Sequence, residues 1–258
     1  MVVSCSFRDE FFDHLEGSQR KYECDEPAVK DGLCIFHHPE YWRNNPDEVR
    51  EELQRKIEEA IEKGEYVICI GYNIPEINLT NKKIDVPFYF MSANIYGKAQ
   101  LGRSIYYSFI DFSMAIFHGE IVFNSSKFHN NVYFSFANFK KNAYFRMAEF
   151  KGKVDFNNAK FERDAIFWAC KFEKEADFSS VEFRGSADFR LTSFSREVDF
   201  SSSIFEIARF YETNFKGYAN FGYAKFTSKA NFKRATFKAG KNFSNISLPK
   251  NKSEIILP

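Results

Sequence analysis

Long apolar runs and targeting signals are missing from this sequence. It contains no stretch of about 18 consecutive apolar residues, so we expect no transmembrane helix. Its first residues, Met1-Val2-Val3-Ser4-Cys5, lack the basic and apolar regions of a secretory signal. Cysteine is sparse, with 5 in 258 residues, and an early cluster lies near histidines, which suits metal binding in a reducing cytosol better than disulfides. The sequence therefore predicts a cytoplasmic protein with no membrane span.

Catalytic signatures are missing as well. No glycine-rich phosphate-binding motif occurs, no Ser-His-Asp set is suggested, and all 5 histidines lie in the N-terminal half. Cys170 occupies a position that the repeat described below fills with small buried residues, so we expect it to be inert. We therefore predict a non-enzymatic protein.

Phenylalanine, in contrast, is abundant and regularly spaced. The chain has 33, and most of them follow alternating steps of five and six residues, with one slip of register between Phe200 and Phe215. A small or β-branched residue stands two positions before every member of this ladder except Phe243, which follows Lys241. The ladder comprises residues 134, 139, 145, 150, 156, 161, 167, 172, 178, 183, 189, 194, 200, 205, 210, 215, 221, 226, 232, 237 and 243. Such internal periodicity fixes the architecture before any other feature does.

Neither an α-helix nor a straight strand can use this period. On a helix, steps of five and six residues rotate by roughly 140° and 240°, which scatters the rings around the cylinder. In a straight strand, a step of five sends successive rings to opposite faces. The pattern works if the chain turns a corner after each Phe, so that Phe and the small residue two positions before it both point inward. Four such sides make a coil of 22 residues, and the slip predicts one tighter corner between Phe200 and Phe221.

These triplets carry a family resemblance. Ala176-Asp177-Phe178, Ala187-Asp188-Phe189 and Ala219-Asn220-Phe221 resemble the unit of pentapeptide-repeat proteins, and the steps continue backwards to Phe90. The resemblance implies the same architecture as the period, an all-β solenoid in the form of a right-handed quadrilateral β-helix, and the N-terminal residues described below predict a small zinc and helix cap on it. We predict that residues 1–64 form a Cys/His module with a capping helix, residues 65–248 form the β-helix, and residues 249–258 form a tail that is flexible or crosses the last coil.

The N-terminal module contains a candidate metal centre. Cys5, Cys24, Cys34 and His37 supply three thiolates and one imidazole, the donors that tetrahedral structural zinc requires. The segment from Gly32 to His37 resembles the closing half of small CCCH zinc knuckles. Four protein ligands leave no open position, so the sequence favours a structural zinc over a catalytic one. The alternatives are that His38 replaces His37, or that these residues are buried free thiols beside a surface histidine pair.

A helix is predicted directly after this module. Asn45 can cap it, Pro46 suits its first position, Glu48 completes a capping box, and Gly64 can end it in a left-handed conformation. Its narrow apolar stripe predicts that it packs against the open end of the β-helix, where an uncovered coil would expose a strand edge. The stripe comprises Val49, Leu53, Ile57, Ala60 and Ile61.

Outward-facing residues that recur every coil form columns on the surface. Asp111, Asp155, Asp177 and Asp199 form one column, interrupted by Tyr133, and we expect each carboxylate to accept backbone N–H groups of its own turn; a cation site is the alternative. Another side is predicted to place an indole between two guanidinium groups at one-coil spacing, an arrangement typical of protein interfaces. This predicted binding face consists of Tyr144, Arg146, Ile166, Trp168, Arg190 and Tyr211. The alternative is that this patch shields itself or lies under the tail.

Three functional hypotheses follow. The first is a rigid scaffold that binds an unidentified protein partner, as a monomer or an end-to-end dimer. The second, which the resemblance implies, is a DNA mimic that binds gyrase; the charge balance of +8 over residues 90–243, from 23 Lys and Arg against 15 Asp and Glu, argues against it. The third is weak nucleic-acid binding through residues 200–243, which hold 8 Lys and Arg and 2 acids. We favour the first hypothesis.

Overall fold

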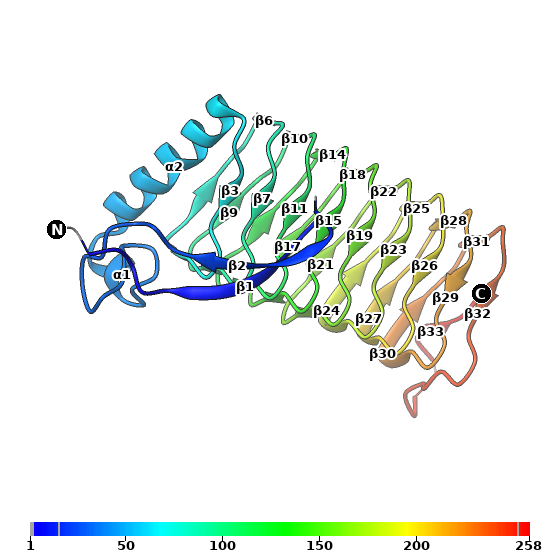
Figure 1. The fold of residues 1–258 in the computed structure, drawn as a ribbon. Coiled ribbons are helices and arrows are strands. Elements are labelled where there is room, and N and C mark those ends of the chain that lie inside the picture. Colours follow the sequence, from blue (N-terminus) through cyan, green and yellow to red (C-terminus); the bar gives the residue numbers. More distant parts are fainter. Residues whose placement is uncertain (1–2, 15, 252) are drawn as a thin grey trace.

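The chain winds into a solenoid of about nine turns, as Figure 1 shows. The structure is a computed structural model that describes residues 3–14, 16–251 and 253–258. Residues of successive coils pair in parallel register at the predicted interval, for example Ile105 with Lys127. The predicted right-handed quadrilateral β-helix is confirmed.

Four faces surround the core, and we number them in chain order. Face 1 is a nine-stranded sheet made of β3 (Val67–Ile68), β7 (Phe88–Tyr89), β11 (Ile110–Asp111), β15 (Val132–Tyr133), β19 (Val154–Asp155), β23 (Ala176–Asp177), β26 (Val198–Asp199), β29 (Ala219–Asn220) and β32 (Lys241–Asn242). Face 4 is an eight-stranded sheet made of β6 (Lys83–Ile84), β10 (Ile105–Tyr106), β14 (Lys127–Phe128), β18 (Glu149–Phe150), β22 (Lys171–Phe172), β25 (Ser193–Phe194), β28 (Asn214–Phe215) and β31 (Thr236–Phe237).

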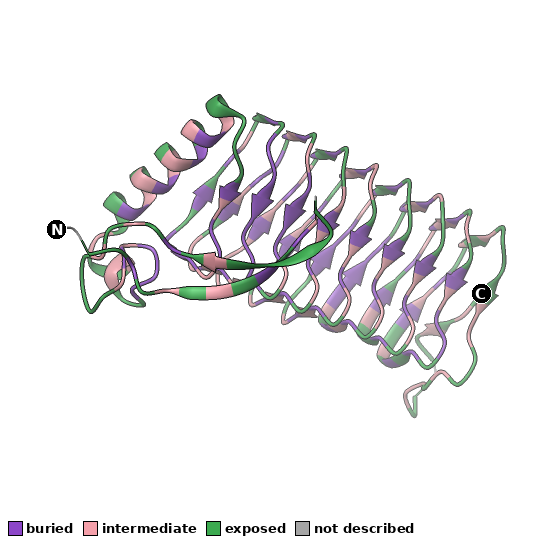
Figure 2. Cartoon of the chain, in the orientation of Figure 1, coloured by how far each residue is buried: buried purple, intermediate pink, exposed green. Residues whose placement is uncertain are grey.

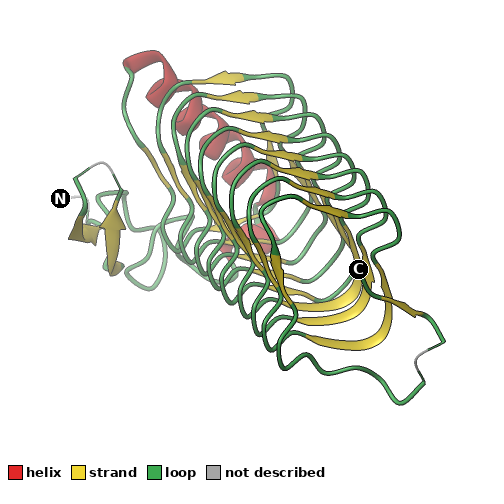
Figure 3. Ribbon diagram, turned by 90° about the vertical axis from the view of Figure 1, so that its right-hand side faces the viewer, coloured by secondary structure: helices red, strands yellow, loops and turns green. Residues whose placement is uncertain are grey.

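Faces 2 and 3 belong to one continuous sheet. Face 2 contains β4 (Asn73–Ile74), β8 (Asn94–Ile95), β12 (Ile116–Phe117), β16 (Asn138–Phe139) and β20 (Lys160–Phe161). Face 3 contains β5 (Ile77–Asn78), β9 (Ala99–Gln100), β13 (Ile121–Val122), β17 (Ala143–Tyr144), β21 (Ala165–Ile166) and β33 (Ile255–Ile256). Three longer strands run around the corner between these faces and appear as curved arrows in Figure 3: β24 (Glu182–Asp188), β27 (Ile204–Arg209) and β30 (Lys225–Asn231).

The phenylalanine ladder fills the core. Rings one coil apart stack nearly parallel, with the Phe167 centroid 4.7 Å from that of Phe145 and 4.8 Å from that of Phe189. The small residues between the rings are also buried. Where such a residue is polar, its hydroxyl is hydrogen-bonded to the backbone; Thr192, for example, donates to the carbonyl of Phe167 at 2.6 Å. Cys170 likewise donates to the carbonyl of Phe145 and is fully buried. Figure 2 shows the resulting continuous buried interior.

Two diagonally opposite corners of each coil place one residue in the left-handed conformation. These residues stand two positions after every second Phe of the ladder and recur every 11 residues, for example Ser125, Phe136 and Met147, each with φ near +58°. The five-residue steps of the ladder span these corners, and the six-residue steps span the other two. The tighter corner predicted between Phe200 and Phe221 is confirmed, because the pairing of β27 with both neighbours shifts register before Ile207.

Two helices lead into the solenoid. The predicted helix is α2 (Pro46–Lys63), which lies at the start of the solenoid in Figure 1. Its buried residues Val49, Leu53, Ile57 and Ala60 belong to the same core cluster as Val67 of the first coil. Its C-terminal cap is confirmed, since Gly64 has φ +69° and its N–H donates to two carbonyls of the last turn.

The predicted capping box is wrong. A short helix α1 (Tyr41–Asn44) precedes α2, so the N–H of Asn45 already donates to the carbonyl of Tyr41. The side-chain amide of Asn45 donates to the same carbonyl, and the carboxylate of Glu48 accepts from the hydroxyl of Tyr41 instead of returning to the cap.

A hairpin of β1 (Arg8–Asp13) and β2 (Ser18–Glu23) lies over the first coils of face 1, where Figure 1 shows it in dark blue. Phe11 packs against Tyr89 and Phe109 in a separate apolar cluster, and the hydroxyl of Tyr89 donates to Asp13 at 2.9 Å. His14 stacks on Tyr133 and bonds to Asp111. No pattern in the sequence predicted this arm.

The C-terminal tail crosses the last coil. Strand β33 pairs in parallel with β30, and Ser247 forms a further bridge with Lys225. Ile246, Leu248, Ile255 and Leu257 pack against the end of the core. Among the described residues, no helix has both the length and the apolar character required to cross a bilayer.

Candidate metal centre and binding face

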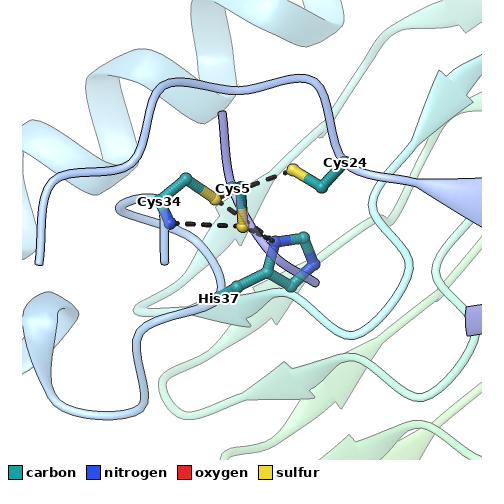
Figure 4. Close-up of side chains that lie close together, drawn as sticks. All are labelled: Cys5, Cys24, Cys34 and His37. Carbon is teal, nitrogen blue, oxygen red and sulfur yellow. Dashed lines mark hydrogen bonds between the residues drawn. The ribbon is translucent and has the colours of Figure 1, made fainter. Parts of the chain in front are cut away.

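Four side chains from three separate segments converge beside the base of the hairpin. Cys5 precedes β1, Cys24 directly follows β2, and Cys34 and His37 belong to one turn before α1, as Figure 4 shows. All four side chains are buried, and their donor atoms lie within 4.8 Å of one another. The structure thus brings together all four predicted ligands.

The spacing of the donor atoms matches tetrahedral coordination. Zn–S bonds of 2.3 Å and a Zn–N bond of 2.0–2.1 Å imply S···S separations of about 3.8 Å and S···N separations of about 3.6 Å. The Sγ atoms of Cys24 and Cys34 are 3.9 Å apart, and Nδ1 of His37 lies 3.2 Å from Sγ of Cys34 and 3.5 Å from Sγ of Cys5. The N–H of Cys34 donates to Sγ of Cys5 at 3.3 Å.

The imidazole of His37 is oriented for this role. Its Nε2–H donates to the carbonyl of Ile70 at 2.9 Å, which leaves Nδ1 unprotonated and directed at the thiols. Metal-binding histidines are commonly fixed in this way. The ring of Phe7 stacks on the imidazole of His37, with the two ring centroids 3.8 Å apart. His38, in contrast, lies beside Asp31 and accepts from the N–H of Glu40, so of the two histidines it is His37 that joins the Cys cluster.

The thiols are electrostatically prepared for a cation. The pKa of Cys24 is lowered, chiefly because the thiol of Cys34 donates to its sulfur, with a further contribution from His37. The same hydrogen bond raises the pKa of Cys34, which keeps its proton. Since the thiolate is the form that binds metal, the cluster holds one ligand in its binding state and a second that releases a proton on coordination.

Gly71 couples the metal centre to the first coil. It has φ +67°, and a Cβ at this position would lie 2.5 Å from Cζ of Phe7, the ring that stacks on His37. The preceding residue, Ile70, supplies the carbonyl that orients His37. The turn at the start of the solenoid therefore positions both the backbone acceptor and the stacking ring of the fourth ligand.

The predicted binding face lies on face 3 and the corner that follows it. The N–H of Met147 donates to the carbonyl of Trp168, and that of Leu191 donates to the carbonyl of Tyr211, so the columns continue across the short corner. Trp168 and Tyr211 therefore lie on the same side of the solenoid, as predicted.

The side chains on this face differ from the prediction in two respects. Arg146 lies over the ring of Tyr144 at 5.5 Å, and Arg190 makes two hydrogen bonds to the carboxylate of Asp188, so neither guanidinium stacks on Trp168. Arg146 is therefore held by the ring of Tyr144, and Arg190 is held by the carboxylate of Asp188. Ile166 is buried at 8% exposure, whereas Trp168 is half-buried beside the exposed Arg146 and Arg190.

Two apolar side chains beside this face were not predicted. Met147 is 55% exposed and Leu191 is 46% exposed, and both occupy left-handed corner positions with φ near +60°. At the same corner other coils place Ser125 and Ala169, whereas the opposite corner holds residues as different as Asn158 and Phe136. The sequence signal was available, because a large apolar residue two positions after a ladder Phe is both exposed and strained.

The aspartate column on face 1 has the structural role that we favoured. Asp111, Asp155, Asp177 and Asp199 each accept the N–H of the residue two positions later at 2.7–2.8 Å. Asp111 uses its second oxygen for His14, at 2.8 Å. These carboxylates therefore stabilise the turns that follow them through local hydrogen bonds, and Asp111 also binds the hairpin through His14.

Comparison with protein-family models agrees with this geometry. Residues 137–182 and 178–225 match the family model described as pentapeptide repeats (9 copies). The chain carries pentapeptide repeats, and its solenoid is a pentapeptide-repeat β-helix. Such a solenoid is typical of structural or binding proteins rather than of enzymes. Comparison with curated proteins and with solved structures found no match.

Proposed function

We propose that this protein is a rigid, non-catalytic scaffold that binds a protein partner through face 3, and that a structural zinc holds its N-terminal module together. The observation that carries the first part is the cluster of Met147, Trp168 and Leu191 flanked by Arg146 and Arg190. Exposed aromatic and apolar residues with arginines at their edge are typical of protein interfaces. Met147 and Leu191 stand at left-handed corners with 55% and 46% of their surface exposed, so their apolar side chains are open to a partner.

Zinc is the metal that the donor set favours. Three thiolates and one imidazole at tetrahedral spacing match structural zinc sites, and Cys5, Cys24, Cys34 and His37 together leave no open coordination position. Zinc would join the base of the hairpin to the turn before α1, because its ligands come from both. Thiolate ligands require a reducing compartment, which supports a cytoplasmic location.

Elemental analysis tests the metal. Protein purified without chelators should contain about one zinc per chain. Cys34→Ser should lose it, whereas Cys170→Ser, which changes a buried thiol far from the cluster, should retain it. Wild-type protein without zinc would refute the assignment.

Partner capture from an extract of the native cell tests the binding face. Trp168→Ala should weaken capture by about thirtyfold or more, the loss typical of a central interface aromatic. Leu191→Asn should also weaken it without loss of stability, because asparagine tolerates the left-handed corner.

Phe136→Asn is the matched control. It removes an exposed apolar side chain from the diagonally opposite corner, also at φ +58°. Partner capture that depends on Phe136 but not on Trp168 or Leu191 would place the interface elsewhere.

The gyrase-directed DNA mimic remains a second candidate because of one observation. Asp155, Asp177 and Asp199, with Glu175 and Glu197 beside them, line a shallow cleft on face 1 beyond the hairpin. A supercoiling assay with purified gyrase separates the two hypotheses. Inhibition that is lost in Asp177→Asn would favour the mimic, and unchanged supercoiling would favour the scaffold.

A further inference from the structure

A second cleft lies on face 3 at its C-terminal end, and it originates in the slip of the repeat. The corner of β27 is one residue shorter than those of its neighbours, so Ile207 occupies the position that Ser186 and Lys229 occupy in the adjacent coils. The tail strand β33 closes the far side with Glu254 and Ile256. The cleft has a volume of about 450 Å³, within the range of small-molecule sites.

Three cations from successive coils line this cleft along a diagonal. Arg190 follows the end of β24, Arg209 is the last residue of β27, and Lys229 lies within β30. These three strands are neighbours in one sheet, about 4.8 Å apart. The outer two are neutralised, since Arg190 pairs with Asp188 at 2.7 Å and Lys229 pairs with Glu254 at 2.8 Å.

The central cation is not neutralised. Within the part of the chain that the structure describes, the guanidinium of Arg209 has no ion-pair or hydrogen-bond partner. Because its two neighbours already pair with carboxylates, this exposed guanidinium is free to bind an anion. Arginine binds phosphate through two parallel hydrogen bonds, which makes a phosphate group well suited to this position.

Apolar surface lies directly beside these charges. Ile256 is 46% exposed, and Tyr211 and Ile207 line the same cleft. A planar base can pack on such side chains while its phosphate reaches the guanidinium. We propose that this cleft binds a nucleotide, either free or within a single strand, with Arg209 as the central phosphate ligand. The cleft shares Arg190 and Tyr211 with the protein-binding face, but its central ligand, Arg209, lies outside that face.

Calorimetric titration of the full-length, zinc-loaded protein tests the proposal with three probes: AMP, inorganic phosphate and a short oligothymidylate. AMP should bind one site and more tightly than phosphate. Arg209→Ala should weaken AMP binding by about tenfold or more, the loss expected for a charge-assisted contact. The same variant should unfold at an unchanged temperature, because among the described residues the guanidinium of Arg209 has no hydrogen bond or ion pair to lose.

Two further variants sharpen the result. Ile256→Ser should weaken AMP but leave phosphate unchanged, and Arg196→Ala, which removes an exposed arginine at another corner, should change neither. Oligothymidylate that binds more tightly than AMP and weakens with salt would identify a single strand as the source; equal binding would identify a free nucleotide. The proposal fails if none of the probes binds saturably, if Arg209→Ala has no effect, or if phosphate binds as tightly as AMP.

Discussion

Truncation of one mid-ladder ring should measure how strongly the coils depend on each other. Phe167 is fully buried, stacks on Phe145 and Phe189, and meets Phe156 and Phe178 edge-on at 5.5 and 5.4 Å. Phe167→Ala removes a ring of roughly 100 Å³, and at about 24 cal/mol per Å³ the cavity alone costs about 2.4 kcal/mol. The lost transfer energy adds to this, so we expect a total of about 3–5 kcal/mol.

Urea unfolding followed by circular dichroism measures this loss. The unfolding transition should stay cooperative, because neighbouring coils share the stacked column. Phe237→Ala is the matched control: its ring is only half-buried in the last coil and should cost about 1–2 kcal/mol. A loss below about 1 kcal/mol for Phe167→Ala, or equal losses for the two variants, would show that the column does not carry the stability of the solenoid.

Three further predictions concern the N-terminal module and its junction with the first coil. Gly71→Ala should force Phe7 away from His37, lower zinc affinity and cost about 1–3 kcal/mol, measured by competition with a zinc indicator and by urea unfolding; Gly64→Ala, also at positive φ but with free space around it, should leave zinc affinity unchanged. Chelation should release the base of the hairpin and raise binding of an apolar dye as Tyr89 and Phe109 become exposed, while the circular dichroism of the solenoid persists; dye binding that does not change would contradict this. Burial raises the pKa of Cys69 from 9.0 to about 12, so the folded state keeps a proton that the unfolded chain loses, and stability should fall as pH rises from about 9 towards 12; Cys69→Ala should flatten that slope.

The sequence predicted the solenoid because its signal is redundant. Every coil carries the same pattern, in which each ladder Phe and the small residue two positions before it point inward. One slip after Phe205 therefore leaves the architecture intact. The four metal ligands could be chosen because few other Cys and His residues compete for the role. The choice between His37 and His38 could not be made, since it depends on the carbonyl of Ile70, which the fold brings near.

Other features depend on neighbours that only the fold supplies. The capping box failed because α1 already used the N–H of Asn45, and the predicted stacking on Trp168 failed because Asp188 and Tyr144 lie closer to the arginines. The hairpin had a weak signal, the outward apolar Tyr89 and Phe109, which periodicity alone does not distinguish from core residues. The cleft at Arg209 required both the short corner and the tail strand that closes it.

Photo-crosslinking at the corner positions tests the proposed binding face most directly. A photoreactive residue placed at Met147, which is exposed at the corner beside that face, should crosslink one cellular protein in a single defined band. The same residue placed at Phe136 on the diagonal corner should not crosslink that protein. Crosslinking of the same protein from both positions, or from Phe136 alone, would contradict a binding surface on face 3.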